Sequence, residues 1–232
     1  MNKRITLCAC SSRHIIDKEK AAAVASALEA QGYEVKMIAD LCKLVETHDT
    51  ALETISQSIV VACYPRAVAA LFASCGLKEP ERYDIRNESA EEVLAKIAPD
   101  AKEVPVDSSI RKQLDDFPVE EGTDAWFPVM DKSRCINCGK CFDFCLFGVY
   151  AKEDREVKVV HPSSCKNNCP ACSRICPEKA IIFPKYERSP FNGGLKDDEV
   201  IGDSDQAFYA AELRRRLELR KNKVSLLKKE GK

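Results

Sequence analysis

The first 77 residues of the chain alternate short apolar runs with longer amphipathic stretches. Three runs have the length and composition of buried strands: residues 5–10, 33–38 and 58–64. The stretches that follow them carry helical patterns or helix start and stop signals: Asp17 to Gly32, residues 47–57 and Pro65 to Gly76. Residues 83–97 have the pattern of one more strand and helix. Strands separated by helices indicate a parallel sheet, so the pattern predicts an α/β domain over residues 1–98.

The pattern changes beyond residue 98. Residues 99–130 contain four prolines among many acidic residues and are expected to form a linker. Residues 131–185 are rich in cysteine, with residues 156–161 alternating like one arm of a hairpin, and they predict a small α+β domain. Residues 186–232 are expected to form a loop up to residue 203 and then a basic, amphipathic C-terminal helix.

Composition adds one constraint on fold and one on function. The chain has 232 residues, of which 13 are cysteine, and the odd number excludes a fully paired disulfide framework. Its nine glycines include no GxG and no GxxxxGK, the usual cradles for cofactor phosphates. We therefore expect no flavin or nicotinamide site in this chain.

Location and nucleic-acid binding depend on weaker signals. The apolar run near Met1 is too short for a secretory signal, and no run of 18 apolar residues could span a membrane. We expect a cytoplasmic protein, where thiols are more often metal ligands than disulfides. The cluster Arg214-Arg215-Arg216 lacks interleaved aromatic residues, so nucleic acid is not an expected partner.

Eight cysteines form two dense motifs, spaced Cys135-x2-Cys138-x2-Cys141-x3-Cys145 and Cys165-x3-Cys169-x2-Cys172-x3-Cys176-Pro177. A [4Fe-4S] cube needs four thiolates around it, and x2 spacing turns the backbone past one corner of the cube after another. A zinc site uses two CxxC pairs separated by a dozen or more residues, which would leave some of these thiols unexplained. The motifs therefore predict iron-sulfur clusters.

The region over residues 131–184 resembles the bacterial two-[4Fe-4S] ferredoxin family through its segments CINCGKCFDFC and CKNNCPACSRICP. In two-cluster ferredoxins the last cysteine of each motif serves the other cluster. The resemblance thus implies one cluster on Cys135, Cys138, Cys141 and Cys176, and a second on Cys165, Cys169, Cys172 and Cys145. The sequence departs from the family where Leu146 replaces a proline and where the second motif opens with x3 rather than x2.

Four further cysteines lie near the ends of predicted strands: Cys8, Cys10, Cys42 and Cys63. In an open parallel sheet, ligands collect at the carboxyl ends of the strands, so these thiols can converge. Three interpretations remain open: a third [4Fe-4S] cluster or another metal site, buried structural thiols, and a redox-active thiol site. Cys75, at a predicted helix end, is expected to be structural.

The same region is similar to the amino-terminal domain of the heterodisulfide reductase A family. The similarity covers residues 1–77 and rests on CACSSR, LCKL and IVVACYPRAVAALF, with Ser11 in place of the usual glycine. It implies iron-sulfur binding, and redox partners such as a flavoprotein or another iron-sulfur subunit. The family's flavin-binding core is absent. Arg66, close to Cys63, can donate to a cluster sulfur or an anionic partner, or form a structural salt bridge.

Together these features predict an electron-transfer subunit that relays single electrons through two or three [4Fe-4S] clusters, with no catalytic residue of its own. The alternative is a redox or thiol enzyme that uses the four N-terminal cysteines while the ferredoxin region supplies electrons. The histidines His14, His48 and His161 are scattered and suggest no catalytic site. Trp126 is expected to pack over the ferredoxin core.

Overall fold

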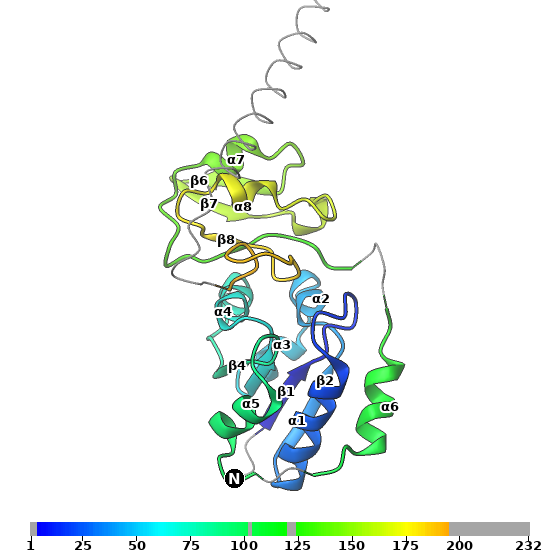
Figure 1. Cartoon of the computed structure of the whole chain (residues 1–232). Coiled ribbons are helices and arrows are strands. Elements are labelled where there is room, and N and C mark those ends of the chain that lie inside the picture. The colour runs from blue at the N-terminus through cyan, green and yellow to red at the C-terminus, as the bar shows by residue number, and fades with distance from the viewer. Residues whose placement is uncertain (1–3, 102–103, 120–123, 195–232) are drawn as a thin grey trace, which may run out of the picture. The chain divides into compact units, whose positions relative to one another are not determined.

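A four-stranded parallel sheet organises the N-terminal half of the computed structural model, which describes residues 4–101, 104–119 and 124–194 (Figure 1). Its strands are β1 (Arg4–Cys8), β2 (Glu34–Ile38), β3 (Ile59–Ala62) and β4 (Arg82–Asp84). They lie in the order β2-β1-β3-β4, with Leu7 of β1 opposite Met37 on one side and Val61 on the other. The predicted α/β fold with a parallel sheet is confirmed.

Helices cover the sheet in two layers (Figure 1). The first layer contains α1 (Lys18–Ala30), α5 (Ala90–Ile97) and α6 (Ser108–Asp116), since α1 contacts both of the others. The second contains α2 (Leu41–Glu46), α3 (Ala51–Ile55) and α4 (Pro65–Ser74), since α2 contacts both of the others. Two layers follow from right-handed crossovers, because the chain leaves β1 in one direction to reach β2 and then returns past β1 to β3.

Local signals start and stop these helices as expected. The Asp17 side chain accepts a hydrogen bond from the Lys20 backbone N–H and caps α1. Pro65 occupies the first turn of α4, where its missing N–H costs nothing. The chain leaves α4 through Gly76 at a φ of +69°, a left-handed conformation that favours glycine.

Residues 99–130, expected to be a linker, contain helix α6 instead. Asp107 caps this helix, and Ile110 and Leu114 are both nearly fully buried in the core of the α/β region. The sequence signal is weak because only these two positions of the nine-residue helix are apolar. Contact with α1 stabilises the helix, and no local pattern reveals that contact.

The cysteine-rich region has short elements. Strand β5 (Val129–Met130) pairs antiparallel with β8 (Ile181–Ile182), and β6 (Tyr150–Glu153) forms a hairpin with β7 (Glu156–Val159), which confirms the predicted hairpin arm. The α-helices are α7 (Lys140–Phe144) and α8 (Ala171–Ile175), with a 3-10 turn at Pro162–Ser164. Trp126 stacks on Phe183 at 5.3 Å between ring centroids, so it packs on this region's core as predicted.

The predicted C-terminal helix, and the part of the predicted loop from residue 195 to 203, lie outside the described residues. Across the described ranges, no helix combines the length and hydropathy that crossing a membrane requires.

If α6 belongs to the folded core, removing its buried side chain will destabilise the protein. We expect Leu114→Ala to lower the free energy of unfolding by about 2–5 kcal/mol, as other buried leucines do. Gln113→Ala, at an exposed position of the same helix, serves as the control and should change it by less than about 0.5 kcal/mol. Anaerobic chemical denaturation followed by circular dichroism measures both, and equal small effects would show that α6 is only a connector.

Candidate metal centres

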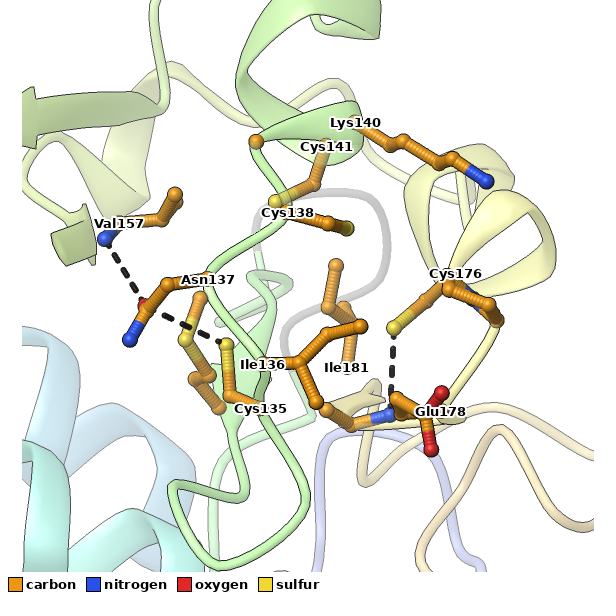
Figure 2. Close-up of a pocket in the computed structure, with 14 residues that line it drawn as sticks. Cys135, Ile136, Asn137, Cys138, Lys140, Cys141, Val157, Cys176, Glu178 and Ile181 are labelled. Carbon is orange, nitrogen blue, oxygen red and sulfur yellow. Dashed lines mark hydrogen bonds between the residues drawn. The ribbon is translucent and has the colours of Figure 1, made fainter. Parts of the chain in front are cut away.

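The first cysteine set surrounds one pocket. Cys135 and Cys138 come from the loop that leads into α7, Cys141 lies in α7, and Cys176 comes from the end of α8, yet all four line the same cavity (Figure 2). Much of the remaining lining is apolar and includes Ile136, Val157 and Ile181. The structure thus brings the last cysteine of the second motif to the first motif.

Backbone conformation holds the loop of the first motif in place. Gly139 has a φ of +82°, a left-handed conformation that favours glycine. The side-chain oxygen of Asn137 accepts a hydrogen bond from the Val157 N–H at 3.2 Å and ties the loop to β7. The Ala180 N–H lies 3.3 Å from Sγ of Cys176 and donates to it. A donor aimed at sulfur favours the thiolate that a cluster needs.

The remaining cysteines of the two motifs form a second set, Cys145, Cys165, Cys169 and Cys172. Burial, together with the charges of Cys169 and Cys145, raises the pKa of Cys165 to about 12. Burial also raises the pKa of Cys172, whose sulfur lies 3.1 Å from the Tyr150 hydroxyl. Thiols that perturb one another in this way lie close together. Asn168, in the x3 gap, has a φ of 61°, which lets the chain turn back toward Cys169.

The spacing of these thiols bears on which metal they suit. Within the described ranges, no three or more His, Cys, Asp or Glu side chains come close enough together to hold a single metal ion. A tetrahedral zinc site would need its sulfurs packed around one ion at about 2.3 Å. A compact single-ion site of that kind is not found among the described residues.

The four N-terminal cysteines also converge. Cys8 ends β1, Cys10 follows it, Cys63 follows β3, and Cys42 lies in the first turn of α2. The order β2-β1-β3-β4 places a topological switch point between β1 and β3, where open α/β sheets bind their ligands. Cys10 has a φ of 47°, an uncommon conformation for a residue other than glycine, and such strain clusters at functional sites.

The surroundings of the N-terminal thiols are buried and charged. Burial, together with the charges of Asp40 and Cys63, raises the pKa of Cys8 to about 12, and burial raises the pKa of Cys63 to about 11. The Leu41 N–H donates to Sγ of Cys8 at 3.3 Å. Burial acts to lower the pKa of Lys185, but the charges of Cys42 and Asp40 outweigh it and raise the pKa. The cation of Lys185 therefore belongs to this site.

The polar residues around this site were not predicted from the sequence. Nζ of Lys185 lies 2.5 Å from a carboxylate oxygen of Asp40, 2.8 Å from Oγ of Ser12 and 3.4 Å from Asp124, and its side chain is only 2% exposed. Asp124 also pairs with Arg13 at 2.6 Å. Asp40 could have been recognised as a helix cap, but no local pattern connects Lys185 with residues more than 60 positions earlier.

Other predicted residues have structural contacts. Arg66 forms an ion pair with Asp131 at 2.6 Å and also donates to the carbonyl oxygen of Lys179. The salt bridge that the sequence allowed for Arg66 is thus present. Cys75 caps the end of α4 and is half-buried, and burial raises the pKa of its thiol.

Two convergent cysteine sets of this spacing, on short helices and the loops beside them, define an iron-sulfur protein of the ferredoxin class. Comparison with known proteins agrees. Residues 127–150 match the model of a 4Fe-4S binding domain. The chain is 33% identical over 88 residues to Ferredoxin-3 of Nostoc sp., with 28% of this chain aligned and 90% of that protein covered. Through this domain the chain belongs to the 4Fe-4S ferredoxin family.

Two archaeal relatives match the same share of the chain. An uncharacterized ferredoxin of Methanocaldococcus jannaschii is 52% identical over 61 residues, which is 26% of this chain and 42% of the relative. Pyruvate synthase subunit PorD of Methanothermobacter marburgensis is 39% identical over 61 residues, again 26% of this chain and 65% of the relative. The chain spans less than half the length of the Methanocaldococcus protein, and the family therefore supports iron-sulfur electron transfer in this chain without identifying its partners.

Replacing Cys176 should remove the cluster that the cysteines of the first motif hold. We expect Cys176→Ser and Cys138→Ser each to lose about four irons, and to lose the same electron paramagnetic resonance (EPR) signal, because both cysteines line one pocket. Cys172→Ser should remove the other signal, and Cys75→Ser should remove neither. The shared-pocket assignment is wrong if Cys176→Ser matches Cys172→Ser instead.

Replacing the buried lysine should destabilise the fold far more than replacing an exposed one. We expect Lys185→Met to lower the free energy of unfolding by about 3–5 kcal/mol, because it leaves Asp40 buried without a cation and leaves Asp124 with Arg13 as its cation. Lys18→Met, which breaks the exposed pair with Asp115, should cost no more than about 1 kcal/mol. Anaerobic urea denaturation at pH 7 compares the two, and similar small losses would show that Lys185 is not needed.

Proposed function

We propose that this protein relays single electrons through two [4Fe-4S] clusters, one held by Cys135, Cys138, Cys141 and Cys176, and the other by Cys145, Cys165, Cys169 and Cys172. The observation that carries the proposal is the meeting of Cys176 with the first three cysteines around one pocket (Figure 2). Such interleaving is the pattern of two-cluster ferredoxins.

When bound, the clusters supply the one-electron chemistry, and the protein positions them and sets their surroundings. Ile136 and Ile181 line the first pocket with apolar surface and limit the access of water. Hydrogen bonds to sulfur lower the charge density of a thiolate, so the Ala180 N–H on Cys176 favours the reduced state. The Tyr150 hydroxyl donates a hydrogen bond to Sγ of Cys172 and favours the reduced state in the same way.

We also propose a third [4Fe-4S] cluster on Cys8, Cys10, Cys42 and Cys63. The position at the switch point of the sheet supports it, as do the Leu41 N–H on Cys8 and the nearby cation of Lys185. Four thiolates and a cluster carry net negative charge, which these groups offset. The residues present thus fit the group.

The thiol-enzyme alternative has less support. A nucleophilic cysteine needs a lowered pKa and access to solvent. Burial instead raises the pKa of Cys8 to about 12 and that of Cys63 to about 11, and Cys8, Cys10 and Cys42 are all buried. Unligated thiols here would be protonated and unreactive at neutral pH, which favours ligation over nucleophilic chemistry.

The partners we propose are redox proteins, a flavoprotein or another iron-sulfur subunit, in a heterodisulfide-reductase-like or similar complex. The relative named as a pyruvate synthase subunit supports membership of a multi-subunit redox enzyme. Ile136, Leu146 and Phe147 expose 62%, 63% and 46% of their surface beside cluster cysteines, as a docking face would. Thiols that serve as ligands stay reduced in the cytoplasm, where we place the protein.

Iron content tests the number of clusters. Three clusters predict about twelve irons and twelve acid-labile sulfides per chain after anaerobic purification, and two predict about eight. Cys8→Ser and Cys63→Ser should each lower the count by about four, because they remove ligands of the same cluster. Cys75→Ser is the control and should leave it unchanged. A wild-type count of eight would reject the third cluster, and a count of zero after reconstitution would reject the whole proposal.

A further inference from the structure

Arg13 joins the N-terminal thiol loop to the loop of the second cysteine motif. It lies three residues after Cys10, and its guanidinium donates to the side-chain oxygens of Asn167 and Asn168, each at 2.7 Å. Both asparagines lie in the gap between Cys165 and Cys169, which is one residue longer than the x2 spacing of the ferredoxin family. The longer gap therefore supplies two acceptors for one planar guanidinium, which suits the fork geometry of arginine.

The position of Arg13 is fixed on two other sides. Its Nε lies 2.6 Å from Asp124, and its guanidinium carbon lies 4.4 Å from the ring centroid of Trp126. Asp124 in turn accepts a hydrogen bond from Asn167 at 3.2 Å and pairs with Lys185 at 3.4 Å. The loop that contains Asn167 and Asn168 is thus held by the Asp124–Lys185 pair as well as by Arg13.

This network continues to the N-terminal thiols. Lys185 pairs with Asp40 at 2.5 Å, and Asp40 accepts a hydrogen bond from the Cys42 N–H at 2.9 Å. An unbroken series of ion pairs and hydrogen bonds therefore runs from Asn167, inside the second motif, to the backbone of Cys42. Arg86 holds the backbone on both sides of Lys185. Its guanidinium donates to the carbonyl oxygens of Pro184 and Tyr186, at 3.0 and 2.9 Å.

The first motif is tied to the α/β region differently. Arg66, three residues after Cys63, bonds to Asp131 and Lys179, which flank the cysteines of the first site rather than lying between them. Packing also distinguishes the second motif from the first. Among the eight motif cysteines of the described chain, Cys165 packs against the core of the α/β region as well as its own.

We infer that Arg13 is a positioning residue that makes the second site, on Cys145, Cys165, Cys169 and Cys172, the electron-transfer neighbour of the N-terminal site. The inference rests on the proposed third cluster. One electron passes between the two sites, so one is oxidised by one electron and the other is reduced by one. No bond forms or breaks, and no proton moves. The electron enters from an external one-electron reductant at the ferredoxin clusters.

The test uses the full chain, reconstituted anaerobically and mixed rapidly with reduced methyl viologen, a one-electron reductant. Freeze-quench EPR follows the arrival of the electron at the N-terminal site, whose signal is identified by its loss in Cys8→Ser. Losing hydrogen bonds from a charged donor lowers the population of the conformation that they hold by about tenfold or more. Because the electron passes from the second site in that conformation, we expect Arg13→Gln to slow the arrival about tenfold and to alter the signal of the second site.

Three further variants separate positioning from folding. Asn168→Ala removes one acceptor while leaving the Arg13–Asp124 pair intact, and it should slow the arrival less than Arg13→Gln. Arg13→Lys keeps the charge but loses the fork, so it should fall between wild type and Arg13→Gln. Arg66→Gln should alter the signal of the first site instead and should slow the arrival less than Arg13→Gln.

The possible outcomes distinguish failure of the positioning role of Arg13 from failure of the proposed third cluster. Twelve irons with an unchanged arrival rate in both Arg13→Gln and Asn168→Ala would overturn the positioning role alone. A larger delay in Arg66→Gln than in Arg13→Gln would assign the first site as the neighbour and overturn it too. Eight irons in wild type, with no third EPR signal, would overturn the third cluster and this inference with it.

Discussion

A lysine cation that is almost completely removed from water needs negative partners around it, since an unpaired buried charge is very costly. Lys185 is in this position, and its partners come from distant parts of the chain. Asp40 follows β2, Asp124 precedes β5, and Lys185 itself follows β8. Satisfying this one cation therefore fixes the cysteine-rich region against the carboxyl edge of the parallel sheet. The positions of the N-terminal thiols depend on the same contact.

The balance of charge in this network has a chemical consequence. Arg13 and Lys185 face Asp40 and Asp124, two cations against two anions, so the network carries no net charge by itself. A negatively charged cluster on the neighbouring thiols would still gain from Lys185, whose charge interacts with Cys42 and Cys10. Burial without ligation would leave those thiols protonated and inert at the switch point of the sheet, where ligands are expected to bind.

Departures from the ferredoxin pattern have a structural explanation at one of the two positions. The additional residue in the second motif lies between Cys165 and Cys169, and the longer gap presents Asn167 and Asn168 to Arg13. Leu146, in place of a proline, is 63% exposed beside Cys145, and no contact in the structure explains the change. The ferredoxin fold thus tolerates an insertion where another part of the chain supports the loop.

Much of the protein could be predicted from sequence because its strongest signals are local. The strands of the sheet, the hairpin arm and the eight motif cysteines each depend on residues a few positions apart, where periodicity and ligand spacing are visible. Helix α6 could not be found in this way, since Ile110 and Leu114 are buried only by contact with the α/β core. Lys185, Asp124 and Arg13 were also invisible, because charged residues look alike in sequence whether they are solvated or buried. Only the tertiary structure, by removing them from water at one edge of the sheet, decided that they connect the N-terminal thiols to the second motif.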